Sequence, residues 1–70
     1  MATKMLTHFV VLYVIIDEGI LPQAFLCQAE DADHAEEQCM DAYPDADVVW
    51  VYEGESPQSA YLEYWEEAAT

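Results

Sequence analysis

The sequence predicts an α+β domain in which a three-stranded antiparallel sheet carries one helix on a face and a second helix at the C-terminus. The chain of 70 residues is long enough for a single domain, residues 1–70. Its apolar, β-branched runs and its helix-patterned segments follow each other as strand, strand, helix, strand, helix. A helical crossover that returns the third strand to pair beside the first gives the sheet order 2-1-3.

Residues 6–16, "LTHFVVLYVII", predict the first strand. Both alternating sets of side chains are apolar, so both faces of this strand are expected to be buried. The following "DEGI" contains a glycine and predicts a turn, and residues 22–29 predict a second strand. Pro22 is acceptable at the start of that strand or on a sheet edge. The two strands are therefore expected to form a hairpin.

Residues 32–43 predict a helix, with Asp31 or Asp33 as its N-cap and Pro44 ending it. Small residues at helical spacing would let this helix lie close to the sheet. The expected inward stripe consists of Ala32, Ala35, Cys39, and Ala42 or Tyr43. Carboxylates occupy the opposite face.

Residues 45–55, "DADVVWVYEGE", predict a third strand that is apolar on both faces. Ser56 is then expected to cap a last helix, with Pro57 at its first position and the helix continuing over residues 58–69. The apolar side chains at helical spacing are Tyr61, Tyr64 or Trp65, and Ala68.

Two strands with apolar faces need more cover than one small-residue helix gives. The sequence therefore predicts a homodimer, with cover by the C-terminal helix of the same chain as the alternative.

Cys27 and Cys39 are the only cysteines, and no signal peptide precedes them. Free, core-facing thiols in a cytoplasmic protein are expected, with a disulfide as the alternative. The apolar run "HFVVLYVII" falls short of the about 20 residues that span a bilayer, so no membrane partner is expected.

Charge is the most unusual feature of the chain. Fifteen Asp and Glu residues face Lys4 as the only fixed cation, which gives a net charge of −14. Such a charge repels nucleic acid and anionic membranes and attracts cationic partners. Direct binding of DNA or RNA is therefore excluded, and a basic nucleic-acid-binding protein is the expected partner.

Much of this charge lies on the first predicted helix. Asp33, Glu37 and Asp41 follow at i, i+4 and i+8, which places like charges about 6 Å apart along one stripe. Each neighbouring pair costs a few tenths of a kcal/mol, on the order of 0.2–0.5, so the stripe indicates selection for the charge itself. The spacing is of the order of that between phosphates along one DNA strand, since B-DNA carries one charge per roughly 1.7 Å of axis over both strands.

The expected partner-binding residues are Glu30, Asp33, Glu36, Glu37, Asp41, Asp45, Asp47, Glu53 and Glu55. Exposed aromatic surface would have to add selectivity, and the candidates are Tyr43, Tyr61 and Trp65. The alternative is that the charge only keeps the protein soluble at high salt. Against this alternative, the chain retains two Trp and five Tyr residues.

In size, charge and element order the chain resembles the small acidic inhibitors that phages make against host nucleic-acid-binding proteins. These include anti-CRISPR proteins, restriction inhibitors, uracil-DNA glycosylase inhibitors and a short inhibitor of host RNA polymerase. The segment "EGESPQSA" is similar to the Glu-Ser element by which glycosylase inhibitors engage the enzyme, here Glu55 and Ser56. The resemblance implies a DNA-mimicking inhibitor in the host cytoplasm that targets a defence nuclease, a repair glycosylase or a polymerase.

Catalysis and metal binding are not expected. His8 and His34 are the only histidines, and neither has a nucleophile or orienting group at suggestive spacing. The segment "DADHAEEQCMD" lacks the glycine and spacing of a calcium loop, and no paired Cys/His pattern of a zinc site exists. The sequence predicts no cofactor, no catalytic residues and no more than adventitious metal binding.

Overall fold

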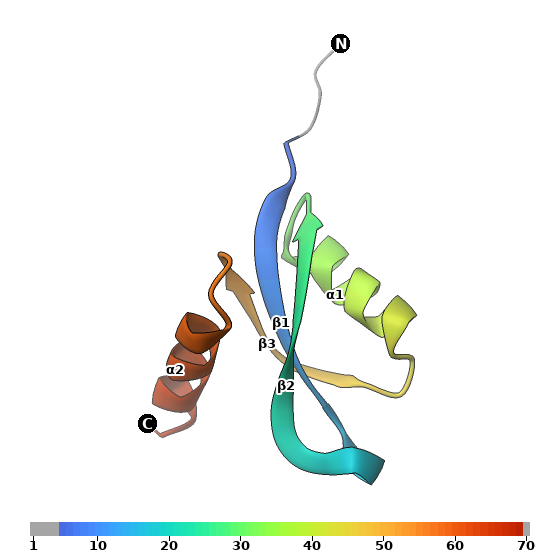
Figure 1. The fold of residues 1–70 in the computed structure, drawn as a ribbon, viewed down its shortest axis with the longest axis vertical. Coiled ribbons are helices and arrows are strands. Elements are labelled where there is room, and N and C mark those ends of the chain that lie inside the picture. The colour runs from blue at the N-terminus through green and yellow to red at the C-terminus, as the bar shows by residue number, and fades with distance from the viewer. Residues whose placement is uncertain (1–4, 70) are drawn as a thin grey trace.

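The computed structural model of the chain describes residues 5–69 and, within them, every side chain except those of Glu18 and Ile20. The elements, in chain order, are β1 (Thr7–Ile15), a 3-10 turn (Ile16–Glu18), β2 (Gly19–Ala29), α1 (Ala32–Ala42), β3 (Asp47–Glu53) and α2 (Pro57–Ala68) (Figure 1). The three strands form an antiparallel sheet of order β2-β1-β3. The predicted fold class, element order and sheet order are confirmed.

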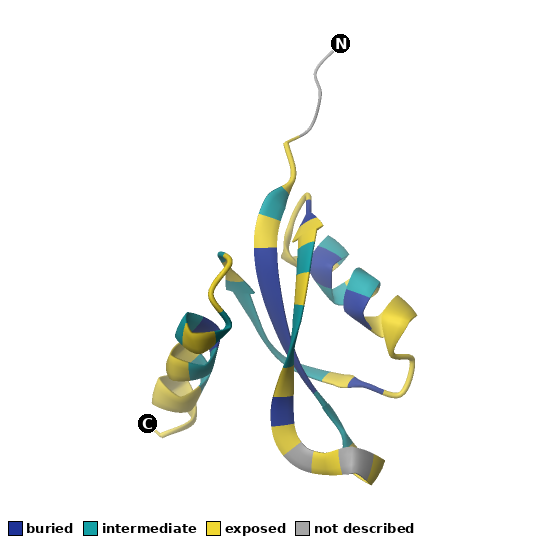
Figure 2. Ribbon diagram, in the orientation of Figure 1, coloured by how far each residue is buried: buried dark blue, intermediate teal, exposed yellow. Residues whose placement is uncertain are grey.

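The central strand β1 is buried on both faces, as predicted. Residues 9–13 of this strand are all buried, and they form the dark blue stretch in Figure 2. The two helices lie on opposite sides of the sheet in Figure 1. The cover that β1 needs is thus supplied within one chain, and the homodimer stays a prediction.

Two apolar clusters fill the space under the helices. Under α1, Phe9 and Val11 pack with Ala35 and Cys39 of the helix. Under α2, the cluster is built from Val10, Leu12 and Ala60, with Trp50, Tyr61 and Tyr64 packed against it. Small residues at the helix contacts allow the close approach that the sequence predicted for α1.

The inward stripe of α1 is shorter than predicted. Ala35 and Cys39 are buried, but Ala32 and Ala42, in the first and last turns, are exposed. At the C-terminal end the helix contacts the sheet through the larger ring of Tyr43, which stacks on Tyr13 at a centroid distance of 4.9 Å. Of the two alternatives at this end, Tyr43 is the one that contacts the sheet, although its side chain stays 40% exposed.

The hairpin between β1 and β2 turns at Gly19, whose φ of +124° is a conformation that L side chains rarely adopt. The strand β2 begins at this glycine and not at Pro22, so its predicted start is three residues late. Pro22 lies inside β2, where its missing N–H is tolerated because β2 is an edge strand.

Both predicted helix caps are present. Oδ1 of Asp31 accepts a hydrogen bond from the backbone N–H of His34 at 2.8 Å. Oγ of Ser56 accepts from the backbone N–H of Ser59 at 3.1 Å, and Pro57 occupies the first turn. Each cap satisfies a donor that the helix itself leaves without a partner.

The helix α2 is held to the sheet by Ala60 and by aromatic side chains. The ring of Tyr64 lies edge-on between Trp50 and Trp65, at centroid distances of 6.2 and 5.0 Å. The predicted inward positions are only partly correct, because Trp65 is 49% exposed and Ala68 is exposed. The helix packs on the sheet through Ala60, Tyr61 and Tyr64, and its last turn is exposed.

Changing Tyr61 to Phe is expected to destabilise the fold by about 1 kcal/mol. The hydroxyl of Tyr61 donates a hydrogen bond to the carbonyl oxygen of Pro22 at 2.9 Å and so ties α2 to β2. Urea denaturation followed by circular dichroism measures this loss. Tyr64→Phe is the matched control, because Tyr64 contacts its neighbours through its ring; an equal loss in both variants would contradict the prediction.

Candidate partner-binding surface

The outer face of α1 carries the predicted stripe of carboxylates. Asp33, Glu37 and Asp41 are all exposed and fall on one side of the helix, away from Ala35 and Cys39. The only Lys or Arg of the chain is Lys4, which lies outside the described residues. Within residues 5–69, no fixed cation therefore balances this face.

Further acidic groups join the stripe around the N-terminal end of α1. Glu30, Asp31, Asp33, His34 and Glu37 line one open hollow on this surface. The ring of His34 is held locally, because its Nδ1 accepts a hydrogen bond from the backbone N–H of Glu30 at 3.3 Å. Its backbone N–H donates to Oδ1 of Asp31, so both hydrogen bonds of His34 stay within the start of the helix.

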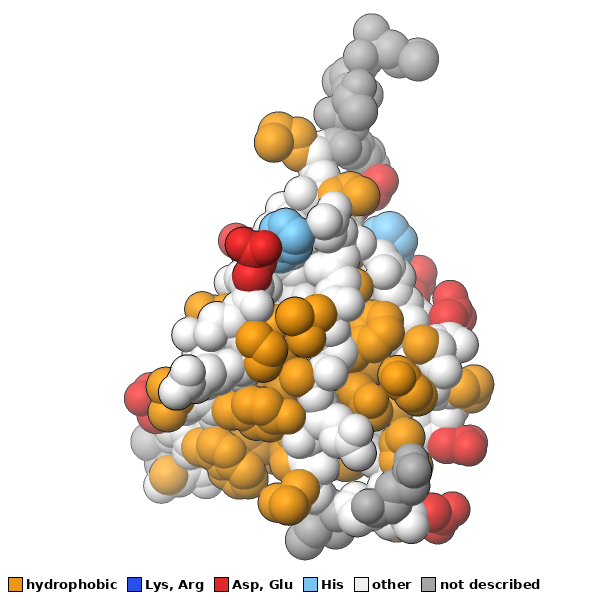
Figure 3. Space-filling view, viewed as in Figure 1, with side chains coloured by type: hydrophobic (Ala, Val, Ile, Leu, Met, Phe, Trp, Pro, Cys, Tyr) orange, Lys and Arg blue, Asp and Glu red, His pale blue; other side chains and the backbone are white. Residues whose placement is uncertain are grey.

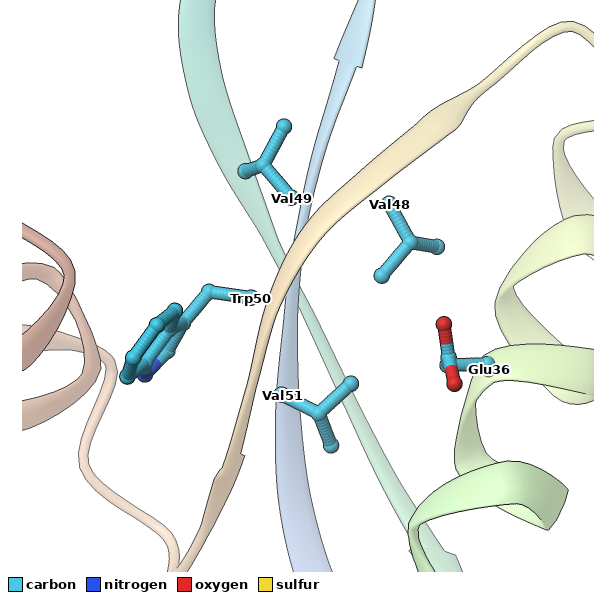
Figure 4. A pocket seen from close by; sticks show the side chains of 5 residues that line it. All are labelled: Glu36, Val48, Val49, Trp50 and Val51. Atoms are coloured by element: carbon cyan, nitrogen blue, oxygen red, sulfur yellow. The ribbon is translucent and has the colours of Figure 1, made fainter. Parts of the chain in front are cut away.

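Glu36 belongs to a different surface from the rest of α1's acidic residues. It is partly buried and lines a hollow with residues 48–51 of β3. Figure 4 shows its carboxylate on the α1 side of this hollow, facing the strand. The reason is the helical period, which places position 36 next to the buried Ala35 and on the side of α1 that faces β3.

The remaining predicted residues lie at the two ends of β3. Asp45 and Asp47 follow the end of α1, are exposed and extend its acidic side. Glu53 and Glu55 lie at the other end of the strand, next to the start of α2 (Figure 1). A strand of this length separates the two groups by roughly 20 Å.

The structure therefore does not bring the predicted residues together in one row. Figure 3 shows acidic side chains at opposite margins of a face that is largely apolar. One group, here called the α1 acidic face, consists of Glu30, Asp33, Glu37 and Asp41 with Asp45 and Asp47. Glu36 faces the β3 hollow, and Glu53 and Glu55 form a separate group.

The Glu-Ser element that carried the resemblance to glycosylase inhibitors makes contacts within the chain. Oε1 of Glu55 lies 3.4 Å from Nε2 of His8, although both side chains remain largely in solvent. The hydroxyl of Ser56 caps α2. For Ser56, the ordinary role of a helix cap before a proline accounts for the residue.

Two of the three candidate aromatic residues are exposed. Tyr43 is 40% exposed and follows directly after α1, so it borders the α1 acidic face. Trp65 lies on α2, on the other side of the sheet. Tyr61 is instead partly buried, because it packs against the cluster under α2, and its hydroxyl donates to the carbonyl oxygen of Pro22. Tyr43 is the aromatic residue best placed to act together with the carboxylates.

Sequence reasoning did not single out the hollow along β3. It is lined by Val48, Val49, Trp50 and Val51 in addition to Glu36. The predicted sheet order contained the signal for it, because the order 2-1-3 leaves the third strand at an edge with its apolar residues half-covered.

The two thiols are unpaired, as predicted, with Cys39 buried and Cys27 partly buried. Burial raises the pKa of both thiols above the ordinary value of 9.0. The pKa of Cys39 is raised further by the neighbouring Cys27 and Glu36. Since the thiolate is the reactive form, neither cysteine is activated as a nucleophile.

Raised thiol pKa values predict that the free energy of unfolding falls when the pH rises above about 9. The unfolded chain releases the Cys39 proton near 9.0, whereas the folded chain keeps it to higher pH. The stabilisation is complete below the unfolded pKa and disappears as the pH passes the folded pKa. Urea denaturation at several pH values should show a shallower alkaline decline for Cys39→Ala than for the wild type; equal slopes would contradict this.

Among residues 5–69, no group of three or more His, Cys, Asp or Glu side chains is arranged to hold a metal ion. Neither helix in this part of the chain is long and apolar enough to cross a membrane. No protein-family model, curated protein or solved structure matches the chain.

Proposed function

We propose that this protein is a small acidic inhibitor, encoded by a phage, that binds the basic nucleic-acid-binding surface of a host protein. Binding of the inhibitor and of DNA or RNA to that surface is mutually exclusive. The target classes are a defence nuclease or CRISPR effector, a repair glycosylase, and a polymerase. The inhibitor acts by occupancy, without catalysis or a cofactor.

The observation that carries the proposal is the α1 acidic face. Three of its carboxylates, those of Asp33, Glu37 and Asp41, project from a capped helix that is packed on the sheet, so their spacing is fixed before binding. Preorganised charge loses little conformational entropy on association. A basic groove that accepts a row of phosphates along one strand can accept a row of carboxylates at helical i, i+4 spacing, about 6 Å apart.

Charge of this kind gives fast, salt-sensitive association but little selectivity. The ring of Tyr43 borders the face and is backed by Tyr13 and by the edge of Phe25, at centroid distances of 4.9 and 6.1 Å. A partly exposed aromatic ring on rigid support is a typical binding hot spot. We assign Tyr43 the selective contact beside the carboxylates.

An affinity pull-down from a bacterial lysate, at low and at moderate salt, tests the proposal. The immobilised wild-type protein is expected to retain a nucleic-acid-binding protein, and added DNA or RNA should release it. Retention of no such protein at either salt concentration would contradict the proposed function.

The competing function is an acid-rich interaction module, homodimeric, whose charge serves solubility in brine. It predicts that self-repulsion keeps the isolated domain unfolded in dilute buffer until molar salt screens the charge. The inhibitor proposal predicts a domain that is already folded at low ionic strength. A salt titration followed by circular dichroism separates the two, and folding only above about 1 M salt would contradict the inhibitor proposal.

A further inference from the structure

The strand β3 has one edge that no other strand covers in the part of the chain that the structure describes. The sheet order is β2-β1-β3, so β3 pairs with β1 alone. The backbone N–H of Gly54 donates to the carbonyl oxygen of His8 at 2.8 Å, which makes these opposing residues a hydrogen-bonded pair. Antiparallel pairs alternate, so the backbone N–H and C=O of Val51 and Glu53 point away from β1, toward the free edge.

A hollow follows this edge. It is lined by Val48 and Val51, which pack on the α1 side of the sheet, and by Val49 and Trp50, which pack on the α2 side. Figure 4 shows these side chains diverging to the two sides of the strand. Since both faces of one strand contribute, the hollow must lie along the strand's edge. It measures about 340 Å³ but is wide open, which suits a segment laid along the strand better than an enclosed small molecule.

The second half of this edge lacks the usual features that keep other strands away. Natural edge strands are protected by proline, lysine, inward-pointing charges or bulges. The opposite edge strand, β2, contains Pro22, whereas the interior of β3, residues 48–52, is entirely apolar or aromatic. A register shift opposite Leu12 and Tyr13 bulges the first half of β3, and the ladder from Trp50 to Glu53 is regular.

The charges around the edge determine which strand fits it. Glu36 lies in the hollow, and Asp47 and Glu53 stand at the two ends of β3. Antiparallel pairing with a second copy would bring Asp47 of one chain near Glu53 of the other, between molecules that each carry a net charge of −14. Like charges opposite each other destabilise a sheet. An extended segment bearing Lys or Arg meets complementary charge at all three positions.

We propose that β3 is a docking edge on which an extended, Lys- or Arg-containing segment of the basic partner adds as a fourth strand. Backbone hydrogen bonds to Val51 and Glu53 supply affinity, and Glu36 pairs with a cationic side chain of the added strand. The identity of the segment as part of a basic protein rests on the proposed function. The docking edge gives the inhibitor a second contact site, which is separate from the α1 acidic face.

The first test uses a short synthetic peptide in which Lys and Val alternate, with amide exchange measured by NMR. In the free protein, the outward amide of Val51 should exchange faster than that of Tyr52, which is bonded to β1. The peptide is expected to slow exchange at Val51. A peptide of the same sequence with alternate backbone amides N-methylated should bind at least about tenfold more weakly, because it loses the backbone hydrogen bonds to β3.

The variant Glu36→Lys should weaken the peptide about tenfold, since it replaces an attraction by a repulsion. Glu63→Lys on the exposed face of α2 is the matched control and should bind nearly as the wild type does. Dispersed amide spectra confirm that both variants fold. Three results would each overturn the docking edge. The N-methylated peptide could bind as tightly as the unmethylated one, or the peptide could slow amide exchange on α1 and not on β3. The third result is slow exchange at Val51 without peptide, caused by dimerisation.

Different results would contradict the docking edge and the proposed function. If a captured partner binds Glu36→Lys as tightly as the wild type but loses affinity for variants of the α1 acidic face, the docking edge is wrong and the proposed function stands. If the peptide protects Val51 but no nucleic-acid-binding protein is ever captured, the docking edge stands and the proposed function is wrong.

Discussion

Replacing the stripe on α1 by amides, in the triple variant Asp33→Asn, Glu37→Gln, Asp41→Asn, is expected to weaken binding to the captured partner by about tenfold to a hundredfold. Exposed ion pairs contribute about 0.2–1 kcal/mol each, and the loss of long-range attraction slows association further. The same variant should be slightly more stable than the wild type, because the like-charged i, i+4 repulsions disappear. A binding loss together with a stability gain excludes unfolding as its cause.

The matched control for this experiment is the triple variant Asp17→Asn, Glu63→Gln, Glu66→Gln. All three carboxylates are exposed and none belongs to α1, since Asp17 lies in the turn between β1 and β2 and the other two lie on α2. Their replacement changes the net charge by the same amount. Surface plasmon resonance at several salt concentrations gives both affinities. The affinity of the α1 variant should also fall less steeply as the salt concentration rises. Equal affinities for the two triple variants would show that only total charge matters, and an affinity equal to that of the wild type would refute the mimicry.

Leu12→Ala is expected to lower the free energy of unfolding by about 2–5 kcal/mol. The side chain of Leu12 is fully buried on the α2 side of β1, in the cluster with Val10 and Ala60. A small domain has only about 5–15 kcal/mol of stability in total, so this loss is a large part of it. Urea denaturation followed by tryptophan fluorescence measures the difference.

Leu26→Ala is the control, because it makes the same chemical change at a position of the adjoining strand that is 55% exposed. Its cost should stay below about 1 kcal/mol, as for most surface substitutions. A Leu12→Ala cost as small as that of Leu26→Ala would mean that α2 does not cover β1 in solution. The second face of the strand would then be left for a dimer partner.

The fold could be predicted because its signals are local and agree with one another. Alternation with apolar residues on both faces marked β1 as the central strand, and the caps at Asp31 and Ser56 marked the helix starts. Helix contacts were harder to predict, because they depend on how each helix lies on the sheet. Trp65 has the spacing of a core residue, yet the close approach at Ala60 leaves it half exposed.

The acidic stripe on α1 followed from helical period alone, so the exposure of Asp33, Glu37 and Asp41 was predictable. The same period turns Glu36 about 100° away from Glu37. That Glu36 faces β3 was not predictable, because it depends on how the helix lies on the sheet. The separation of Glu53 and Glu55 from this face depends on the path of β3 across the sheet, which is a tertiary property. Charge counted along a sequence does not tell which acidic residues share a surface.

The most direct test of the proposed function is a competition experiment. The inhibitor is added to the captured protein bound to its labelled nucleic acid, and fluorescence anisotropy measures how much nucleic acid stays bound. The wild-type chain is expected to displace the nucleic acid completely, with an end point at a fixed molar ratio to the captured protein. The triple variant of the α1 stripe should need about tenfold to a hundredfold more protein for the same displacement. Persistence of the bound nucleic acid at saturating inhibitor, in a ternary complex, would contradict binding at the nucleic-acid surface.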